Sequence, residues 1–124
     1  MREKSPFTVR FWGVRGSIAC SGPRTARYGG NTSSLEVRCG DELLLFDAGT
    51  GMRYLGKTLE ATRLEADLYF THTHFDHICG LPFFRPLFEA QNQIFDEQGW
   101  IMRGGSICGR HHHRRTVLDE ERHW

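Results

Sequence analysis

The stretch "ADLYFTHTHFDHICGLP", Ala66 to Pro82, joins a short apolar run to a dense group of polar side chains. The run Ala66 to Phe70 is short, apolar and bounded, which predicts a buried strand. Directly after it come three histidines and one aspartate, namely His72, His74, Asp76 and His77. Imidazole and carboxylate groups bind borderline divalent metals, so the stretch predicts a metal site at the C-terminal end of a strand.

The spacing within this cluster divides it into two pairs. His72 and His74 lie two residues apart, so on an extended segment both side chains point the same way and can bind one ion. Asp76 and His77 come about a turn later and can face a second ion, because paired catalytic metals lie roughly 3.5 to 4 Å apart and share a bridging hydroxide. The alternative is a surface histidine cluster without metal, which the H-x-H-x-D-H spacing after a buried strand disfavours.

A second carboxylate closes an earlier apolar run, in "LLLFDAGTG". Asp47 follows Phe46 directly, and the glycines after it let the backbone approach its neighbours closely. Two interpretations stay open. Asp47 is either a carboxylate that hydrogen-bonds to a metal ligand and orients it, or an ordinary turn aspartate. The nearby histidines favour the first. A dinucleotide-binding loop is excluded because Tyr54 stands where its third glycine would be.

Sequence periodicity predicts the elements around these motifs. Residues Phe7 to Trp12 alternate as a half-buried strand does, and a loop rich in Gly, Ser, Asn and Thr follows from Arg15 to Ser33. The tight turn "CGDE" joins Leu35 to Cys39 and Leu43 to Phe46 in a predicted hairpin. Apolar residues then recur at three and four positions from Met52 to Leu59, which predicts an amphipathic helix. The expected fold class is therefore α+β.

Composition sets the class of protein. A chain of 124 residues with 39% hydrophobic and 25% charged residues predicts one globular domain. No apolar run approaches the roughly 20 residues of a membrane span, and the N-terminal segment lacks the apolar core of a signal peptide. Four cysteines without a C-x-x-C pair predict a reduced, cytoplasmic setting. The net charge of +1 disfavours nucleic acid as a partner without closing that option.

From about Gln93 onward the sequence shows neither helical nor strand periodicity, so a poorly ordered tail is expected over residues 93–124. Residues His111 to His113 lie beside two arginines. Consecutive residues do not converge on one ion, so a solvated stretch is preferred there to a metal site or a basic patch. Cys79 is interpreted as a small core residue rather than a ligand.

The stretch "THTHFDHICGLPFF" resembles the H-x-H-x-D-H motif of the metallo-β-lactamase superfamily of metal-dependent hydrolases. Three further segments, "FWGVRGSI", "RYGGNTSSLEV" and "LLFDAGTGMRYLG", resemble its cyclic-phosphodiesterase-like and ribonuclease-Z-like branch, in the order of that branch. The resemblance covers about Phe7 to Asn92. It implies that residues 1–92 form the first half of an αββα sandwich, a mixed sheet with flanking helices, and that residues 93–124 lie outside the family pattern.

The resemblance also implies roles for the site residues. It assigns His72 and His74 to a first metal, Asp76 and His77 to a second metal and to catalysis, and Asp47 to support of the site. The family site holds two ions. Zinc is the expected metal, and manganese or iron also suits this set of ligands.

The family draws three further ligands from its second half, and this chain offers no convincing counterpart, since Asp119 and His123 lie among charges. Two functions therefore stay open. One is hydrolysis of a small phosphodiester or nucleotide-like substrate by a metal-activated water. The other is a catalytically incomplete metal-binding fragment. A truncated or frame-shifted coding sequence would explain the change after residue 92, as would a short domain with its own tail, and the oligomeric state stays open.

Overall fold

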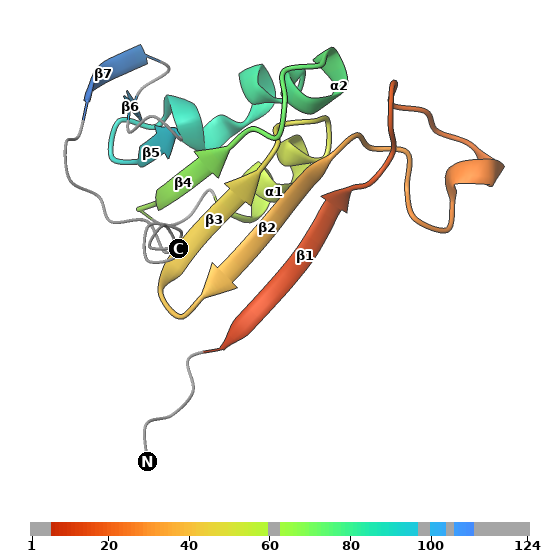
Figure 1. Cartoon of the computed structure of the whole chain (residues 1–124), viewed down its shortest axis with the longest axis horizontal. Helices are drawn as coiled ribbons and strands as arrows, with labels where there is room; N and C mark the ends of the chain where they lie inside the picture. The colour runs from red at the N-terminus through yellow and green to blue at the C-terminus, as the bar shows by residue number, and fades with distance from the viewer. Residues whose placement is uncertain (1–5, 60–62, 97–99, 104–105, 111–124) are drawn as a thin grey trace, which may run out of the picture.

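The computed structural model describes residues 6–59, 63–96, 100–103 and 106–110. The fold is α+β, with one mixed seven-stranded sheet and short helices (Figure 1). The strands are β1 (Phe7–Gly13), β2 (Ser34–Cys39), β3 (Glu42–Phe46), β4 (Glu65–Tyr69), β5 (Gln93–Asp96), β6 (Trp100–Arg103) and β7 (Ser106–Arg110). The helices are α1 (Met52–Thr58) and α2 (Phe75–Ile78), with short 3-10 turns η1 (Pro23–Thr25), η2 (Leu81–Phe83) and η3 (Arg85–Phe88).

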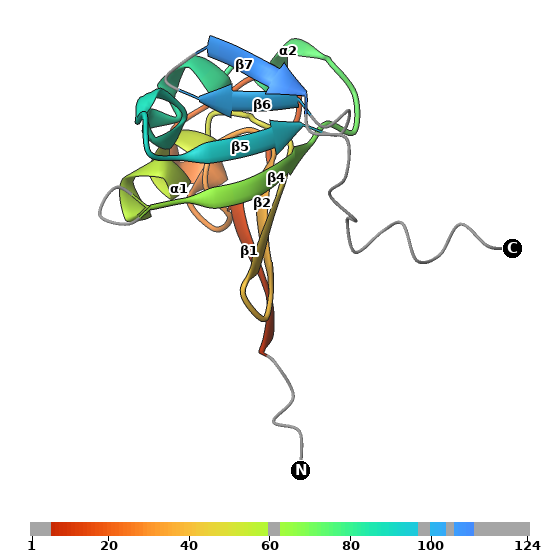
Figure 2. The ribbon, with the colours of Figure 1, turned by 90° about the vertical axis from the view of Figure 1, so that its left-hand side faces the viewer.

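The strands lie in the sheet in the order in which they occur in the chain. The pairs β1–β2 and β2–β3 are antiparallel, β3–β4 and β4–β5 are parallel, and β5–β6 and β6–β7 are antiparallel again. The predicted hairpin is confirmed, and Gly40 supplies the left-handed residue of its turn with a φ of 59°. Twist accumulates across the sheet, so β5 to β7 run across the view of Figure 2 while β1 and β2 run down it.

The core lies between one face of the sheet and α1 with η3. Leu45, Leu68 and Ile94 point from β3, β4 and β5 into it, and Met52 and Leu55 meet them from α1. The predicted helix and the predicted strand before the histidines are both present. This packing fixes β3 and β4 relative to each other, and the candidate site is built on their C-terminal ends.

The opposite face of β1 is open. Strand β1 was expected to be half-buried, but Phe7 and Phe11 are 66% and 64% exposed, and most of the strand is exposed on both faces. Its neighbour β2 continues this face with Leu35 opposite Phe11 and Val37 opposite Val9. The half-buried expectation is wrong because β1 is an edge strand whose apolar face has no layer packed on it among the described residues.

Strands β5 to β7 continue the sheet across the boundary expected at residue 92, where the sequence predicted no strand. Strand β5 pairs in parallel with β4 and buries Ile94 and Phe95, which corrects the expectation of a poorly ordered segment for Gln93–Asp96. Length alone does not explain this difference, because β3 and β4 also have five residues; the places of β5 to β7 depend on pairing across the sheet. The expectations for residues 111–124, which include His111 to His113, Asp119 and His123, lie outside the described residues.

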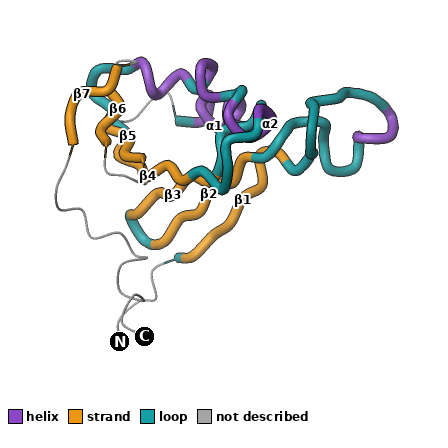
Figure 3. Tube along the Cα trace, turned by 45° about the horizontal axis from the view of Figure 1, so that its top comes forward, coloured by secondary structure: helices purple, strands orange, loops and turns teal. Residues whose placement is uncertain are grey.

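The connection between β1 and β2, residues 14–33, projects from the body of the sheet (Figure 3). Its two ends are pinned together because the N–H groups of Val14 and Arg15 both donate to the carbonyl of Asn31, at 3.1 and 3.0 Å. In the described part of the chain, no helix has the length and apolar character needed to cross a membrane.

Candidate functional site

The candidate site forms where β3 and β4 end. The two strands are parallel and Phe46 is the register partner of Tyr69, so their carboxyl ends meet at the same edge of the sheet. Asp47 follows β3 directly, and its N–H donates to the carbonyl of Tyr69 at 2.8 Å. The segment that begins at Thr71 leaves β4 at the same edge and leads into α2 (Figure 1). Sheet topology therefore brings Asp47 to the histidine cluster.

Asp47 is the buried centre of this arrangement, with only 3% of its surface exposed. One carboxylate oxygen accepts from the Thr71 N–H at 2.8 Å, and the other accepts from the Thr71 hydroxyl at 2.8 Å. The second oxygen also lies 2.9 Å from Nδ1 of His77. Asp47 has a φ of 61°, in the left-handed region that costs most residues energy, so the surrounding contacts must hold it there.

These contacts fix the tautomers of two histidines. The carboxylate of Asp47 only accepts, so His77 donates to it from Nδ1 and Nε2 carries that neutral ring's lone pair. The Thr71 hydroxyl uses its single hydrogen on Asp47, so Nδ1 of His72, 3.0 Å away, must donate to the hydroxyl oxygen. Asp47 thus orients His77 directly and His72 through Thr71, and it leaves Nε2 of each neutral ring free to accept a proton or bind a cation.

Asp76 faces the Nε2 atom that this hydrogen bonding leaves without a hydrogen. Its Oδ2 lies 3.3 Å from His77 Nε2 and accepts from the Ser17 N–H at 2.9 Å. The Ser17 hydrogen bond lowers the pKa of the Asp76 carboxyl from its ordinary value, and positive charge on His77 or His74, when those rings are protonated, lowers it further. An ionised carboxylate and a nitrogen lone pair repel at this distance. Either His77 takes a second proton, or a cation lies between the two groups.

The remaining histidines complete the group at the surface. The ring of His72 lies 4.5 Å from that of His74 and 4.0 Å from that of His77, measured between centroids, and both His72 and His74 are exposed. The structure thus brings together all the predicted site residues. Within the described ranges, however, no three His, Cys, Asp or Glu side chains are arranged to hold one ion as they stand.

Close backbone contacts support the site from beneath. The Gly80 N–H donates to the carbonyl of Ala48 at 2.7 Å, and a Cβ on Gly80 would lie 1.8 Å from the carbonyl oxygen of Gly49. Only glycine allows this approach. Cys79 is half-buried and its sulfur lies 3.9 Å from the hydroxyl of Thr32, so the structure gives it a local contact within this support.

Sequence reasoning missed two residues of the site, Ser17 and Thr71. Ser17 lies 59 residues from Asp76 in sequence, and no local pattern links the two. Thr71 stands directly before the first histidine, and a hydroxyl at that position is the sequence signal for its role.

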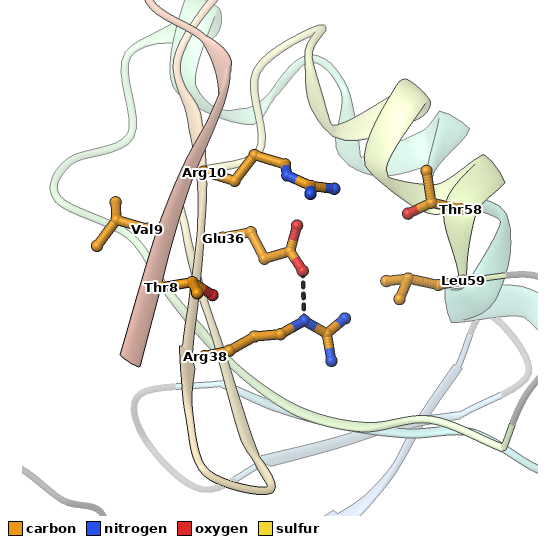
Figure 4. A pocket seen from close by; sticks show the side chains of 7 residues that line it. All are labelled: Thr8, Val9, Arg10, Glu36, Arg38, Thr58 and Leu59. Atoms are coloured by element: carbon orange, nitrogen blue, oxygen red, sulfur yellow. Dashed lines mark hydrogen bonds and ion pairs between the residues drawn. The ribbon is translucent and has the colours of Figure 1, made fainter. Parts of the chain in front are cut away.

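Another cavity, of about 500 Å³, lies between α1 and strands β1 and β2 and contains none of the site residues. Figure 4 shows Arg10, Glu36 and Arg38 side by side along its wall. Glu36 is buried and accepts from Trp12 Nε1 at 2.8 Å and from Arg38 Nε at 2.6 Å. Because both of its oxygens have donors, this network is explained by the packing of the sheet edge.

Comparison with models of known protein families, with curated proteins and with solved structures gives no significant match in any of the three. What the chain can do is therefore argued from the site itself.

Proposed function

We propose that this protein is a metal-dependent hydrolase of phosphodiesters, with the αββα sandwich of the metallo-β-lactamase superfamily represented by its first half. One observation carries the proposal: a carboxylate with a lowered pKa faces a histidine nitrogen that neutral imidazole leaves as a lone pair, 3.3 Å away. A divalent cation resolves the repulsion between these two groups, as a second proton on His77 also would, and the histidine-rich surroundings favour the cation. The H-x-H-x-D-H spacing adds His72 and His74 on the same side.

The donor set fits zinc chemically. Three imidazoles and one carboxylate are ligands that zinc accepts, and manganese or iron tolerates them too. Ligating histidines commonly donate their other ring N–H to a carboxylate, and Asp47 already receives that bond from His77. In the proposal His72 and His74 hold one ion and Asp76 and His77 a second. A bound zinc would supply an activated water at neutral pH and stabilise charge on phosphoryl oxygens.

The chain's own residues have distinct parts in this chemistry. Asp47 keeps the Nδ1 proton on His77 and, through Thr71, on His72, so both neutral rings leave the same nitrogen, Nε2, for a ligand. Asp76, whose carboxylate accepts from the Ser17 N–H, would be available in this proposal to accept a proton from the activated water. His77, hydrogen-bonded to Asp47 behind it, completes the pair assigned to catalysis.

A second candidate function is a metal-binding fragment without turnover. Two features favour it: within the described ranges no three ligands are arranged around one point, and His72 and His74 are exposed to water. Positioning of reactants accounts for roughly 7 to 11 kcal/mol of a typical barrier, so a loosely held site would react slowly.

Metal content and turnover, measured on the same purified chain, separate the two functions. For the hydrolase we expect zinc-dependent or manganese-dependent cleavage of bis(4-nitrophenyl) phosphate and no cleavage of a β-lactam. The double variant His72→Ala/His74→Ala should lose both metal and activity, whereas Thr73→Ala, between them on the same segment, should keep both. Tight zinc binding without cleavage supports the fragment, and absence of zinc binding refutes both functions.

A further inference from the structure

The projecting loop between β1 and β2 is strongly basic. Residues 14–33 contain three arginines, Arg15, Arg24 and Arg27, and no aspartate or glutamate. Among the described residues none of these arginines forms an ion pair. The loop touches the candidate site directly, because the Ser17 N–H that holds Asp76 belongs to it. The loop that contacts the candidate site therefore carries three arginines whose positive charge is available to a ligand.

Two hollows lie on this loop and share one wall. One, of about 490 Å³, runs along Cys20 to Thr25, and the other, of about 340 Å³, is lined by Tyr28 and neighbouring glycines. Arg15, Arg24 and Thr25 line both. Two arginines that line both hollows are suited to an oxyanion, because the planar guanidinium binds phosphate with two parallel hydrogen bonds.

Internal hydrogen bonds hold this wall in shape. Arg15 Nε donates to the carbonyl of Ile18 at 2.7 Å, which directs the guanidinium. The Thr25 hydroxyl lies 3.0 Å from the carbonyl of Cys20 and 3.1 Å from that of Gly22, and the Thr25 carbonyl accepts from the Gly29 N–H at 2.8 Å. A ligand would therefore meet groups that are already placed, which reduces the entropy lost on binding.

An aromatic face lies beside the cationic wall. Tyr28 is 72% exposed, and the Arg27 guanidinium lies 5.1 Å from its ring centroid. Exposed rings next to arginines stack on nucleobases in proteins that bind single-stranded nucleic acid, whatever the base. An ordinary solvated loop would need no such ring and would mix charges of both signs.

We propose that residues 14–33 bind a nucleotide unit of the substrate, with its phosphate between Arg15 and Arg24 and its base on Tyr28. This assignment rests on the proposed function, because the loop that carries the three arginines also contacts Asp76 through the Ser17 N–H. The ligand is a free nucleotide or one unit of a single strand, which share this chemistry.

The test measures binding to the full chain, without turnover, by fluorescence anisotropy of a labelled eight-nucleotide thymidine strand. We expect Arg24→Gln and Tyr28→Ala each to weaken binding by about tenfold, in line with one charge contact or one stacked base. Arg53→Gln and Tyr54→Ala are matched controls. Arg53 and Tyr54 form a similar exposed pair on α1, in which the guanidinium lies 5.8 Å from the ring centroid. Equal losses in both sets would refute the proposal.

Competitors identify the source of the ligand. If adenosine monophosphate and the unlabelled strand have similar inhibition constants per nucleotide, the ligand is a free nucleotide. If the strand binds much more tightly per nucleotide, the ligand is nucleic acid. Inorganic phosphate or ribose phosphate that competes equally well overturns the base contact. The His72→Ala/His74→Ala variant should still bind the strand. If zinc binds and the strand does not, this inference fails while the proposed function stands.

Discussion

Asp47 holds two candidate metal ligands at once, and it does so from a backbone conformation that few residue types adopt. Its carboxylate receives hydrogen bonds from Thr71 and His77, and Thr71 in turn orients His72. Asp and Asn both tolerate a left-handed φ because their short polar side chains bond locally. Replacing Asp47 with Asn therefore changes the hydrogen bonding of the site without adding backbone strain.

We expect Asp47→Asn to weaken zinc binding by about 10- to 100-fold, as loss of an outer carboxylate usually does. The amide has only one accepting atom, its oxygen, so at least one of the hydrogen bonds from Thr71 and His77 is lost and the variant should also lose about 1 to 3 kcal/mol of unfolding free energy. Competition with a chromogenic chelator and urea denaturation measure the two effects. Asp41→Asn, at the exposed turn between β2 and β3, is the control, and equal zinc affinity in both variants would show that Asp47 does not support the site.

At the scale of elements, the strands that position the site could be predicted from sequence and those that complete the sheet could not. Alternation identified β1 and the β2–β3 hairpin, helical spacing identified α1, and the bounded run before the histidines identified β4. Strands β5 to β7 have four or five residues each, and their places depend on pairing with β4 and with one another. Such pairing is a property of the folded chain and leaves no local pattern.

The candidate site divides in the same way. The H-x-H-x-D-H spacing predicted that the histidines and Asp76 belong to the site. The position of Asp47 directly after an apolar run predicted that it lies near them. The contacts that set tautomers and charge, from Thr71 and Ser17, depend on how β3, β4 and the projecting loop meet in space. The sequence therefore predicted which groups form the candidate site, and the structure shows what orients them.

The pairing of β5 with β4 gives a prediction at this scale. Asn92 is buried and ties three segments together, because its Oδ1 accepts from the Leu64 N–H at 2.8 Å and its Nδ2 donates to the Pro86 carbonyl at 2.9 Å. Asn92→Ala leaves both backbone groups unpaired and should cost about 2 to 4 kcal/mol of unfolding free energy. Gln91→Ala, on the exposed neighbour, should cost less than about 0.5 kcal/mol.

Urea denaturation followed by circular dichroism compares the two variants of this pair. If Asn92→Ala and Gln91→Ala unfold at the same denaturant concentration, β5 does not unfold together with the rest of the sheet.

At the scale of the whole molecule, the open apolar face of β1 and β2 should govern solution behaviour. Phe7, Val9 and Phe11 are exposed on an edge strand, and edges with apolar residues associate with other chains. We expect the native chain to self-associate with rising concentration, as measured by sedimentation velocity. Phe11→Lys should shift the distribution toward monomer, whereas Thr8→Lys, on the other face of β1, should not. A monomer at every concentration would contradict this expectation.

The order of the strands bears on how the chain reaches its fold. Every strand lies beside the one that preceded it in the chain, so each pairing closes only the single connection between two consecutive strands. During synthesis, β1 to β3 can pair before β4 has left the ribosome, and each later strand finds a formed edge to join. The sheet can therefore grow in one direction as the chain is made, and Asp47 reaches its final contacts only when Tyr69, Thr71 and His77 have followed it.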